Sequence, residues 1–196
     1  MHYRCLKRQM RAGGKYALVP IREEDMQAIR IWRNDQIDVL RQRAPLSEED
    51  QRRYYERVVR PSFDDPKPDL ILFSYLLDGV LIGYGGLTHI DWDAERAEVS
   101  FLLETARTAD EKRYADEFGI FLRMLQDVAF GDLGLNRLFA ETYDIRPHHV
   151  AVLEQNGFEP EGRLRQHVKI RGRFVDALVH GCLKAWWERE RSVLER

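Results

Sequence analysis

The segment 70–104 constrains the fold more than any other part of the chain. It holds two β-rich runs, Leu70–Leu77 and Val80–Ile90, joined by Asp78-Gly79. An Asp-Gly pair between apolar runs is a strong signal for a two-residue β-hairpin. A third β-rich run, Arg96–Glu104, follows closely. The segment therefore predicts a three-stranded antiparallel meander, around which the rest of the chain must be arranged.

Two helices are expected before the meander, after a short first strand at Tyr16–Val19. Apolar residues recur at three-residue steps within 22–35, which predicts an amphipathic helix. Ser47 begins a loose capping box, and the second helix is expected to run from there to about Val59. Pro61 follows just beyond, where a proline is expected to end a helix.

The elements after the meander alternate between helices and strands. They are a helix from Asp110 or Ala115 to Phe130, a strand over 136–144, a helix from Pro147 to Gly157, a hairpin that turns at Arg171-Gly172, and a short C-terminal helix over 185–196. The two strand–helix–strand crossovers require parallel pairing near the middle of the sheet. The order predicts one α+β domain with a mixed central sheet flanked by helices.

Charge and cysteine usage narrow the functional classes. With 31 Lys+Arg against 33 Asp+Glu, the chain has no general attraction to nucleic acid or membrane, and no apolar run is long enough to span a bilayer. The basic segment 1–15 lacks the apolar core of a secretory signal, so we expect a flexible or loosely docked arm. Cys5 and Cys182 form no disulfide framework. A cytoplasmic protein with its main domain at 16–184 is expected.

Three segments resemble the GNAT superfamily of acyl-CoA N-acyltransferases. They are Ile29–Asp35, Leu81–Leu103 and Leu133–Arg165. The last is the most specific, because a strand, a helix begun by proline, Gly-Phe and acid-Gly-Arg follow one another. The resemblance implies acetyl transfer from acetyl-CoA to an amine. Within the superfamily the chain looks similar to ribosomal-protein N-terminal acetyltransferases and to acetyltransferases of nucleotide-linked amino sugars.

The resemblance also implies where the cofactor lies. It places acetyl-CoA in a V-shaped cleft where the strand Ala97–Leu103 splays from the strand Leu138–Tyr143, with contacts from Phe101, Leu102 and Leu103. The pyrophosphate is expected on the N-terminus of the next helix, where backbone N–H groups and the helix dipole favour an anion.

The phosphate loop of the family, Arg/Gln-x-x-Gly-x-Gly/Ala, aligns with Asp110–Ala115 and departs from the pattern. Only Ala115 keeps it, and two acids open the loop. The implied cofactor contacts there are Lys112, Arg113, Tyr114 and Ala115. A shifted alignment instead brings Arg107 near the cofactor. Because of these departures, a non-catalytic binding module of the same fold is the alternative function.

The helix that begins at Pro147 departs from the family too. Arg146 occupies the slot of an Asn that contacts the cofactor arm, and Leu153 that of a Tyr that protonates the departing thiolate. Arg146 is therefore expected near the cofactor. His148-His149 is interpreted as a helix start, with one ring packed or facing the groove. Adjacent helical residues point about 100° apart, unlike the i,i+4 pair that binds zinc, so no metal is expected.

Amine acetylation requires a base, because the nucleophile must be neutral. Glu98 and Ser100 share one face of their strand, opposite the apolar odd positions. Relatives use a Glu in this strand, so Glu98 is the predicted base or water-orienting residue. The alternative is a structural ion pair with Arg96 or a cross-strand neighbour. His89 is the second base candidate, with a strand-end role near Asp91 as its alternative, and Ser100 is a candidate proton donor to the thiolate.

The acceptor is expected to be a small-molecule amine, an amino sugar on a nucleotide carrier, and a protein or peptide N-terminus is the runner-up. The segment "WRND" resembles a signature of amino-sugar acetyltransferases, so Arg33 and Asn34 are predicted to bind substrate, with Trp32 either stacking or in the core. Arg165 and Lys169 come from a strand with basic residues at every odd position, which predicts an anion site or else a solvated edge. Trp186-Trp187 is a candidate surface for a homodimer.

Overall fold

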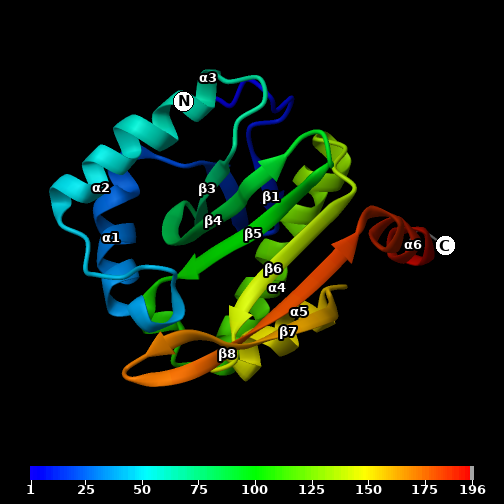
Figure 1. The fold of residues 1–196 in the computed structure, drawn as a ribbon. Coiled ribbons are helices and arrows are strands. Elements are labelled where there is room, and N and C mark those ends of the chain that lie inside the picture. Colours follow the sequence, from blue (N-terminus) through cyan, green and yellow to red (C-terminus); the bar gives the residue numbers. More distant parts are fainter. Residues whose placement is uncertain (195–196) are drawn as a thin grey trace.

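Within residues 1–194, which the computed structural model describes, eight strands form one mixed sheet with helices on both faces (Figure 1). The order across the sheet is β1-β2-β3-β4-β5-β6-β8-β7. The strands are β1 (Arg11–Gly13), β2 (Tyr16–Pro20), β3 (Ile71–Leu77), β4 (Val80–Asp91), β5 (Arg96–Leu103), β6 (Arg137–Tyr143), β7 (Glu159–Ile170) and β8 (Arg173–Leu183). The predicted α+β class is confirmed.

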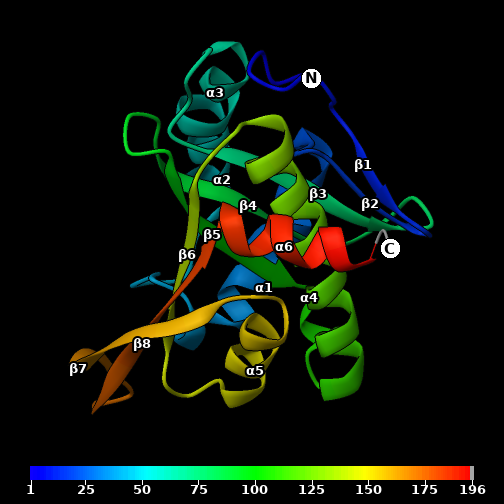
Figure 2. The ribbon, with the colours of Figure 1, turned by 90° about the vertical axis from the view of Figure 1, so that its right-hand side faces the viewer.

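The helices lie in two groups. They are α1 (Met26–Asp35), α2 (Glu48–Tyr54), α3 (Arg60–Asp64), α4 (Glu111–Gln126), α5 (Pro147–Gln155) and α6 (Lys184–Leu194). Helices α1 to α3 cover one face of the sheet, and α4 and α5 cover the other (Figures 1 and 2). No helix within the described residues is both long and apolar enough to cross a bilayer.

The meander forms as predicted. Asp78 and Gly79 have φ angles of 49° and 82°, the left-handed pair that a two-residue hairpin turn requires. Strand β3 pairs antiparallel with β4, and β4 pairs antiparallel with β5. A bulge in β4 between Thr88 and Asp91 interrupts the second ladder, and this bulge determines where His89 points.

Only one of the two expected parallel pairings is present. Strands β5 and β6 pair in parallel, joined by α4. Strand β7 does not pair with β6, because β8 returns through the hairpin turn at Arg171-Gly172 and pairs antiparallel with both. The expectation of two parallel ladders is wrong because β8, the second strand of the hairpin, lies between β6 and β7 in the sheet.

The second helical segment does not end at Val59 as expected. A π-helical stretch, Tyr55–Val59, leads directly into α3, and Pro61 lies in the first turn of α3. A proline is tolerated in a first turn because the N–H that it lacks is not needed there. The proline therefore marks a change of helix type and not the end of the helix.

The N-terminal segment 1–15 is docked, and the expectation of a flexible or loosely docked arm is wrong. Tyr3 is only 1% exposed, and its ring packs 4.5 Å from the ring of Phe63. Its hydroxyl donates to the carbonyl of Leu72 (2.9 Å) and accepts from the same residue's N–H (2.8 Å). Strand β1 then pairs with β2. The Tyr3 hydroxyl thus forms hydrogen bonds with both backbone groups of Leu72, one residue beyond Phe73, where the β2–β3 ladder ends.

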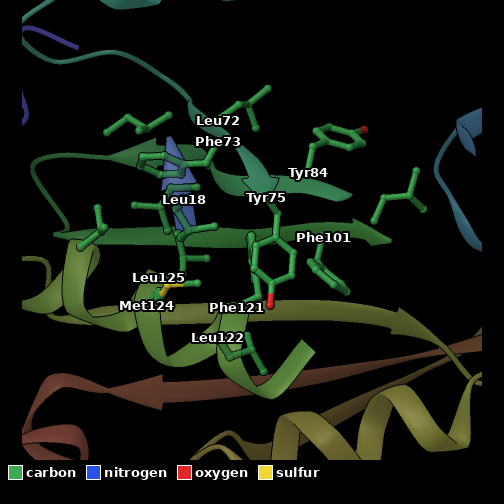
Figure 3. Close-up of a cluster of buried hydrophobic side chains, with 14 of the residues drawn as sticks. Leu18, Leu72, Phe73, Tyr75, Tyr84, Phe101, Phe121, Leu122, Met124 and Leu125 are labelled. Carbon is green, nitrogen blue, oxygen red and sulfur yellow. The ribbon is translucent and has the colours of Figure 1, made fainter. Parts of the chain in front are cut away.

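Aromatic and aliphatic side chains fill the space between the sheet and α4 (Figure 3). Phe101 of β5 stacks on Phe118 of α4, with ring centroids 4.4 Å apart. Tyr75 of β3 donates its hydroxyl hydrogen to the carbonyl of Glu117 at 2.9 Å. Figure 3 shows Phe121 and Leu122 of α4 beneath these strands. This layer fixes β5 against α4 and so positions one wall of the candidate site.

The tail covers this chain's own core. The ring of Trp187 lies 5.6 Å from that of Phe130, in the π-helical stretch Asp127–Asp132 that continues α4. The Trp187 side chain is thus partly buried against this chain's own core, and the role of Trp186-Trp187 in a dimer surface is untested. A homodimer stays a prediction.

Candidate active site

Strands β5 and β6 separate after a short parallel ladder. Only Arg96–Glu98 of β5 pair with Arg137–Phe139 of β6. Beyond Glu98, β5 pairs only with β4, and β6 only with β8. A cavity of about 270 Å³ opens in this gap, with walls from both strands, α5 and the loop between α1 and α2. The predicted splay of the central strands is present.

Glu98 lies on the cavity wall at the point where the strands part. It is 7% exposed and accepts hydrogen bonds from both terminal nitrogens of Arg41, at 3.0 and 2.5 Å. Nδ1 of His89 lies 2.9 Å from Oε2 of the same carboxylate. Arg41 also lies 3.5 Å from Glu141 of β6. The structure thus brings the two predicted base candidates together beside a guanidinium.

The arginine that pairs with Glu98 in the structure is not Arg96, the partner that the sequence suggested. Arg96 lies 3.4 Å from Asp91 instead, and Arg41 holds Glu98 from a loop 57 positions earlier in the sequence. Asp91 also accepts from the N–H of Ala94 at 2.9 Å, so it closes the β4–β5 turn and does not cap His89. No local pattern identifies Arg41, because its place depends on how its loop folds over β5.

The backbone at the bulge aims His89 into the site. His89 has a φ of 50°, in the left-handed region that few non-glycine residues adopt. Its side chain is 69% exposed and lines the cavity. Within the described residues, Nε2 of His89 has no hydrogen-bond partner. Such strained, non-regular backbone is found preferentially at functional sites.

The N-terminus of α4 is the predicted place for the cofactor pyrophosphate. The carboxylate of Asp110 caps the helix by accepting from the N–H of Arg113 at 3.0 Å. The N–H groups of Glu111 and Lys112, in the first turn, have no acceptor within the helix and remain for an anion. A surface cavity of about 520 Å³ lies here, lined in part by Lys112 and Arg113. The free N–H groups suit a phosphate group, whereas three carboxylates of the same lining, those of Asp110, Asp116 and Glu117, oppose it.

The alternative cofactor residue, Arg107, is already paired. It donates to Glu104 at 2.9 Å and to Glu117 at 2.6 Å. Burial raises the pKa of Glu117, and Arg107 acts against that shift. Arg107 lines the same cavity as Lys112 and Arg113, and Arg113 also lies 3.9 Å from a carboxylate, that of Asp110. Both loop alignments therefore stay predictions.

The helix start at Pro147 brings three predicted or suspected residues into one cluster. Arg146 donates to the hydroxyl of Tyr114 at 2.8 Å, and that hydroxyl lies 2.7 Å from Nδ1 of His149. The His149 ring stacks on Phe118 with centroids 4.5 Å apart. Burial, and then the charge of Arg146, hold the pKa of His149 well below its usual range. A neutral His149 is therefore the acceptor of the Tyr114 proton.

This cluster forms the cofactor-side wall of the cavity. His149 and Arg146 line it, together with Leu153, whereas the Tyr114 side chain is buried behind them. Burial raises the pKa of Tyr114 to about 12, so Tyr114 acts as a fixed hydrogen-bond donor. Within residues 1–194, no group of three or more His, Cys, Asp and Glu side chains is placed to hold a metal ion.

The other predicted cofactor contacts on β5 differ in their access to the cavity. Ser100 and Phe101 line it, whereas Leu102 and Leu103 do not and are buried in the core. The carbonyl of Leu103 already accepts from Gln36 at 2.9 Å. Side-chain contact with a cofactor is thus available at Phe101, and Leu102 and Leu103 act through packing.

The two predicted acceptor residues on α1 have different surroundings. Arg33 lines the cavity and donates to the hydroxyl of Tyr84 at 2.5 Å. The amide of Asn34 is used by the chain itself: it donates to the carbonyl of Leu46 (2.9 Å) and accepts from its N–H (2.8 Å) and from Gln42 (2.9 Å). These three bonds hold the α1–α2 loop, and substrate binding by Asn34 stays a prediction. Trp32 is a core residue.

The basic strand is less regular than its sequence suggests. A bulge in β7 between Leu164 and Val168, with Gln166 at a φ of 50°, interrupts the alternation. Leu164 is 39% exposed, so the expected apolar face is not buried. Arg165 is exposed and does not line the gap between β5 and β6. Lys169 lies near the hairpin turn, with Nζ 5.5 Å from the centre of the Phe174 ring.

Comparison with known proteins supports the same family. Residues 18–179 match the model of the acetyltransferase (GNAT) domain. The chain belongs to the GNAT acetyltransferase family. A Bacillus licheniformis protein described as an uncharacterized N-acetyltransferase p20 is 31% identical over 104 residues, which are 53% of this chain. The matched part spans just over half, 56%, of that relative.

Solved structures with this fold include spermidine N-acetyltransferases. The Vibrio cholerae spermidine N-acetyltransferase in complex with CoA and spermine gives a TM-score of 0.77 at 19% identity, over 89% of this GNAT chain and 99% of that one. A dodecameric form of the Vibrio cholerae enzyme gives 0.69 at 18% identity, over 89% and 97%. At this level of identity the likeness establishes the fold alone.

Proposed function

We propose that this protein transfers the acetyl group of acetyl-CoA to a primary amine. The observation that carries the proposal is the pairing of His89 with Glu98 at the point where β5 and β6 separate. A neutral His89 that carries its proton on Nδ1, facing Glu98, leaves Nε2 ready to take a proton. A protonated acceptor amine loses that proton to Nε2, directly or through water, and becomes nucleophilic.

Arg41 acts as a positioning residue in this proposal. Its two hydrogen bonds fix the Glu98 carboxylate, which in turn orients the imidazole of His89. The thiolate that leaves CoA takes its proton from water or from Ser100, which lines the cavity. Leu153 lines the cavity on the cofactor side and has no proton to give. An acid at that slot is not required, since water protonates a thiolate readily.

The acceptor that we propose is an amino sugar on a nucleotide carrier. The acceptor end of the cavity carries two guanidinium groups, Arg33 and Arg41, beside two carboxylates, Glu98 and Glu141. A polyamine such as spermidine, the acceptor that the structural neighbours are named for, requires an excess of carboxylates. A balanced wall suits an amine whose other groups are neutral or anionic. A peptide N-terminus is the second candidate, on the family resemblance.

The test combines a titration with a turnover screen. Isothermal titration with acetyl-CoA should show micromolar affinity, since the first turn of α4 offers N–H groups and Lys112. Release of CoA should then be followed with three acceptors at equal concentration: a UDP-linked amino sugar, a peptide with a free N-terminus, and spermidine. We expect the highest kcat/KM with the amino sugar. No binding at millimolar acetyl-CoA would favour a non-catalytic module, and a preference for spermidine would refute the acceptor class.

A further inference from the structure

A second cavity adjoins the acceptor end of the candidate active site. It has a volume of about 600 Å³ and lies between the segment 37–43 of the α1–α2 loop and the end of strand β7. Leu40, Arg41 and Tyr143 line both this cavity and the gap between β5 and β6. The two spaces therefore adjoin at these three residues.

The second cavity is strongly basic. Its lining includes four cationic side chains and one carboxylate: Arg41, Arg43, Lys169, Arg171 and Asp38. Asp38 is bound to Arg171 at 2.5 Å, which fastens the hairpin turn to the loop. Arg41 is directed to Glu98, which lines the other cavity. Arg43 and Lys169 form no ion pair with any described residue.

Two cations without carboxylate partners, held in one concavity, raise the local potential and favour an anion. Arg43 comes from the loop that Asn34 holds through Leu46 and Gln42. Lys169 comes from a strand end fixed by the Arg171–Asp38 pair. Both cations are thus attached to backbone that other contacts position, which reduces the conformational cost of binding an anion.

We propose that this cavity binds a phosphate or diphosphate group of the acceptor substrate, while the acceptor's amine lies at Glu98 and His89. The assignment of the phosphate to the acceptor rests on the proposed function. A cofactor phosphate is the other source of the same chemistry. Its site at the first turn of α4 is lined by Lys112 and Arg113 and shares no lining residue with the second cavity.

Isothermal titration with UDP, in the presence of saturating acetyl-CoA, tests the site, because the cofactor's own phosphate positions are then filled. The variant is Arg43→Ala with Lys169→Ala. Loss of two charge-assisted contacts to phosphate should weaken UDP binding roughly tenfold or more. The matched control is Arg173→Ala, an exposed arginine of the same hairpin that does not line the cavity. It should change UDP affinity by less than about twofold, as expected for a screened surface charge.

Each outcome separates the site from the enzymatic proposal. UDP binding that depends on Arg43 and Lys169 supports the site whether or not acetyl transfer is found. No UDP binding at millimolar concentration, or equal affinity in the double variant, overturns it. So does a double variant that loses acetyl-CoA affinity instead, since the phosphate would then be the cofactor's. Unchanged acetyl-CoA affinity in the double variant also reports that the fold is intact.

Discussion

Substitution of Glu98 by Gln tests the proposed proton transfer directly. Gln keeps the size and shape of the side chain but removes the charge that faces His89 and Arg41. The proposal requires that the imidazole gain a proton as the amine attacks, and the Glu98 carboxylate stabilises that positive charge. The variant should therefore bind acetyl-CoA normally and turn over slowly.

The expected magnitude follows from the proposed role of the pair. Two unit charges 2.9 Å apart, the distance from His89 to Glu98, interact by about 6 kcal/mol at an effective dielectric constant of about 20. Because the His89 side chain is 69% exposed, solvent screening reduces this interaction to a small part of that value in the resting enzyme. A positioned general base contributes about 10²- to 10⁴-fold to the rate, so we expect kcat to fall by about 10²-fold.

The assay is steady-state release of CoA with the acceptor that the screen returns, at saturating acetyl-CoA. Glu161→Gln is the matched control: Glu161 also pairs with an arginine, Arg137, on the same sheet but away from the cavity. Both variants should lose about 1 kcal/mol of stability, seen as a fall in Tm of about 2–4 °C. Only Glu98→Gln should lose turnover. A kcat within threefold of wild type would refute the role of Glu98.

Three further outcomes are expected. Gly85→Ala would place a Cβ 2.2 Å from the carbonyl oxygen of Ser100 and should lower the free energy of unfolding by about 3 kcal/mol in urea denaturation. The control is Gly162→Ala, whose Cβ would meet nothing within 4 Å and which should lower the free energy of unfolding far less. Equal losses of stability in the two variants would contradict this packing. Asp110→Asn keeps the helix cap but removes the charge beside the expected pyrophosphate, so the Kd for acetyl-CoA measured by titration should fall roughly two- to fivefold; a weaker complex would place the phosphate elsewhere. Because the pKa of His149 is lowered in the fold, the unfolded state binds its proton first as pH falls below about 6.5, so stability should decrease there with a slope of up to about 1.4 kcal/mol per pH unit. His149→Phe should lose that part of the slope in thermal melts at pH 5 to 7, and equal slopes in both proteins would show that another group is responsible.

Local signals predicted most of the elements. Asp78-Gly79 adopts the two left-handed conformations that its hairpin needs, Ser47 caps α2 with Asp50, and Pro147 begins α5. Each of these depends on residues within four positions of one another, so the sequence contains the whole interaction. Pro61 is the exception, because a π-helical stretch before it changes what the proline does.

The site residues divide in the same way. Strand alternation is enough to predict that Glu98 and Ser100 share a face. It does not predict which residues reach the cavity, because Val99 and Phe101 of the other face line it too. The partners of Glu98 are not predictable, since Arg41 is 57 positions away on an irregular loop. Asn34 differs: its family resemblance favours substrate, whereas its amide is used to hold that same loop.

By itself, the sequence determined the class of the fold, the strand that carries Glu98, and the helix start that carries Arg146 and His149, because apolar periodicity, turn residues and caps act over short distances. The splay of that strand was implied by the family resemblance. Only the tertiary structure decided which charges meet. It placed Arg41 on Glu98, buried His149 against Phe118, and left Arg43 and Lys169 together without carboxylates. These outcomes depend on where separate segments of chain come together in space, and charge pairing across such distances has no local pattern in the sequence.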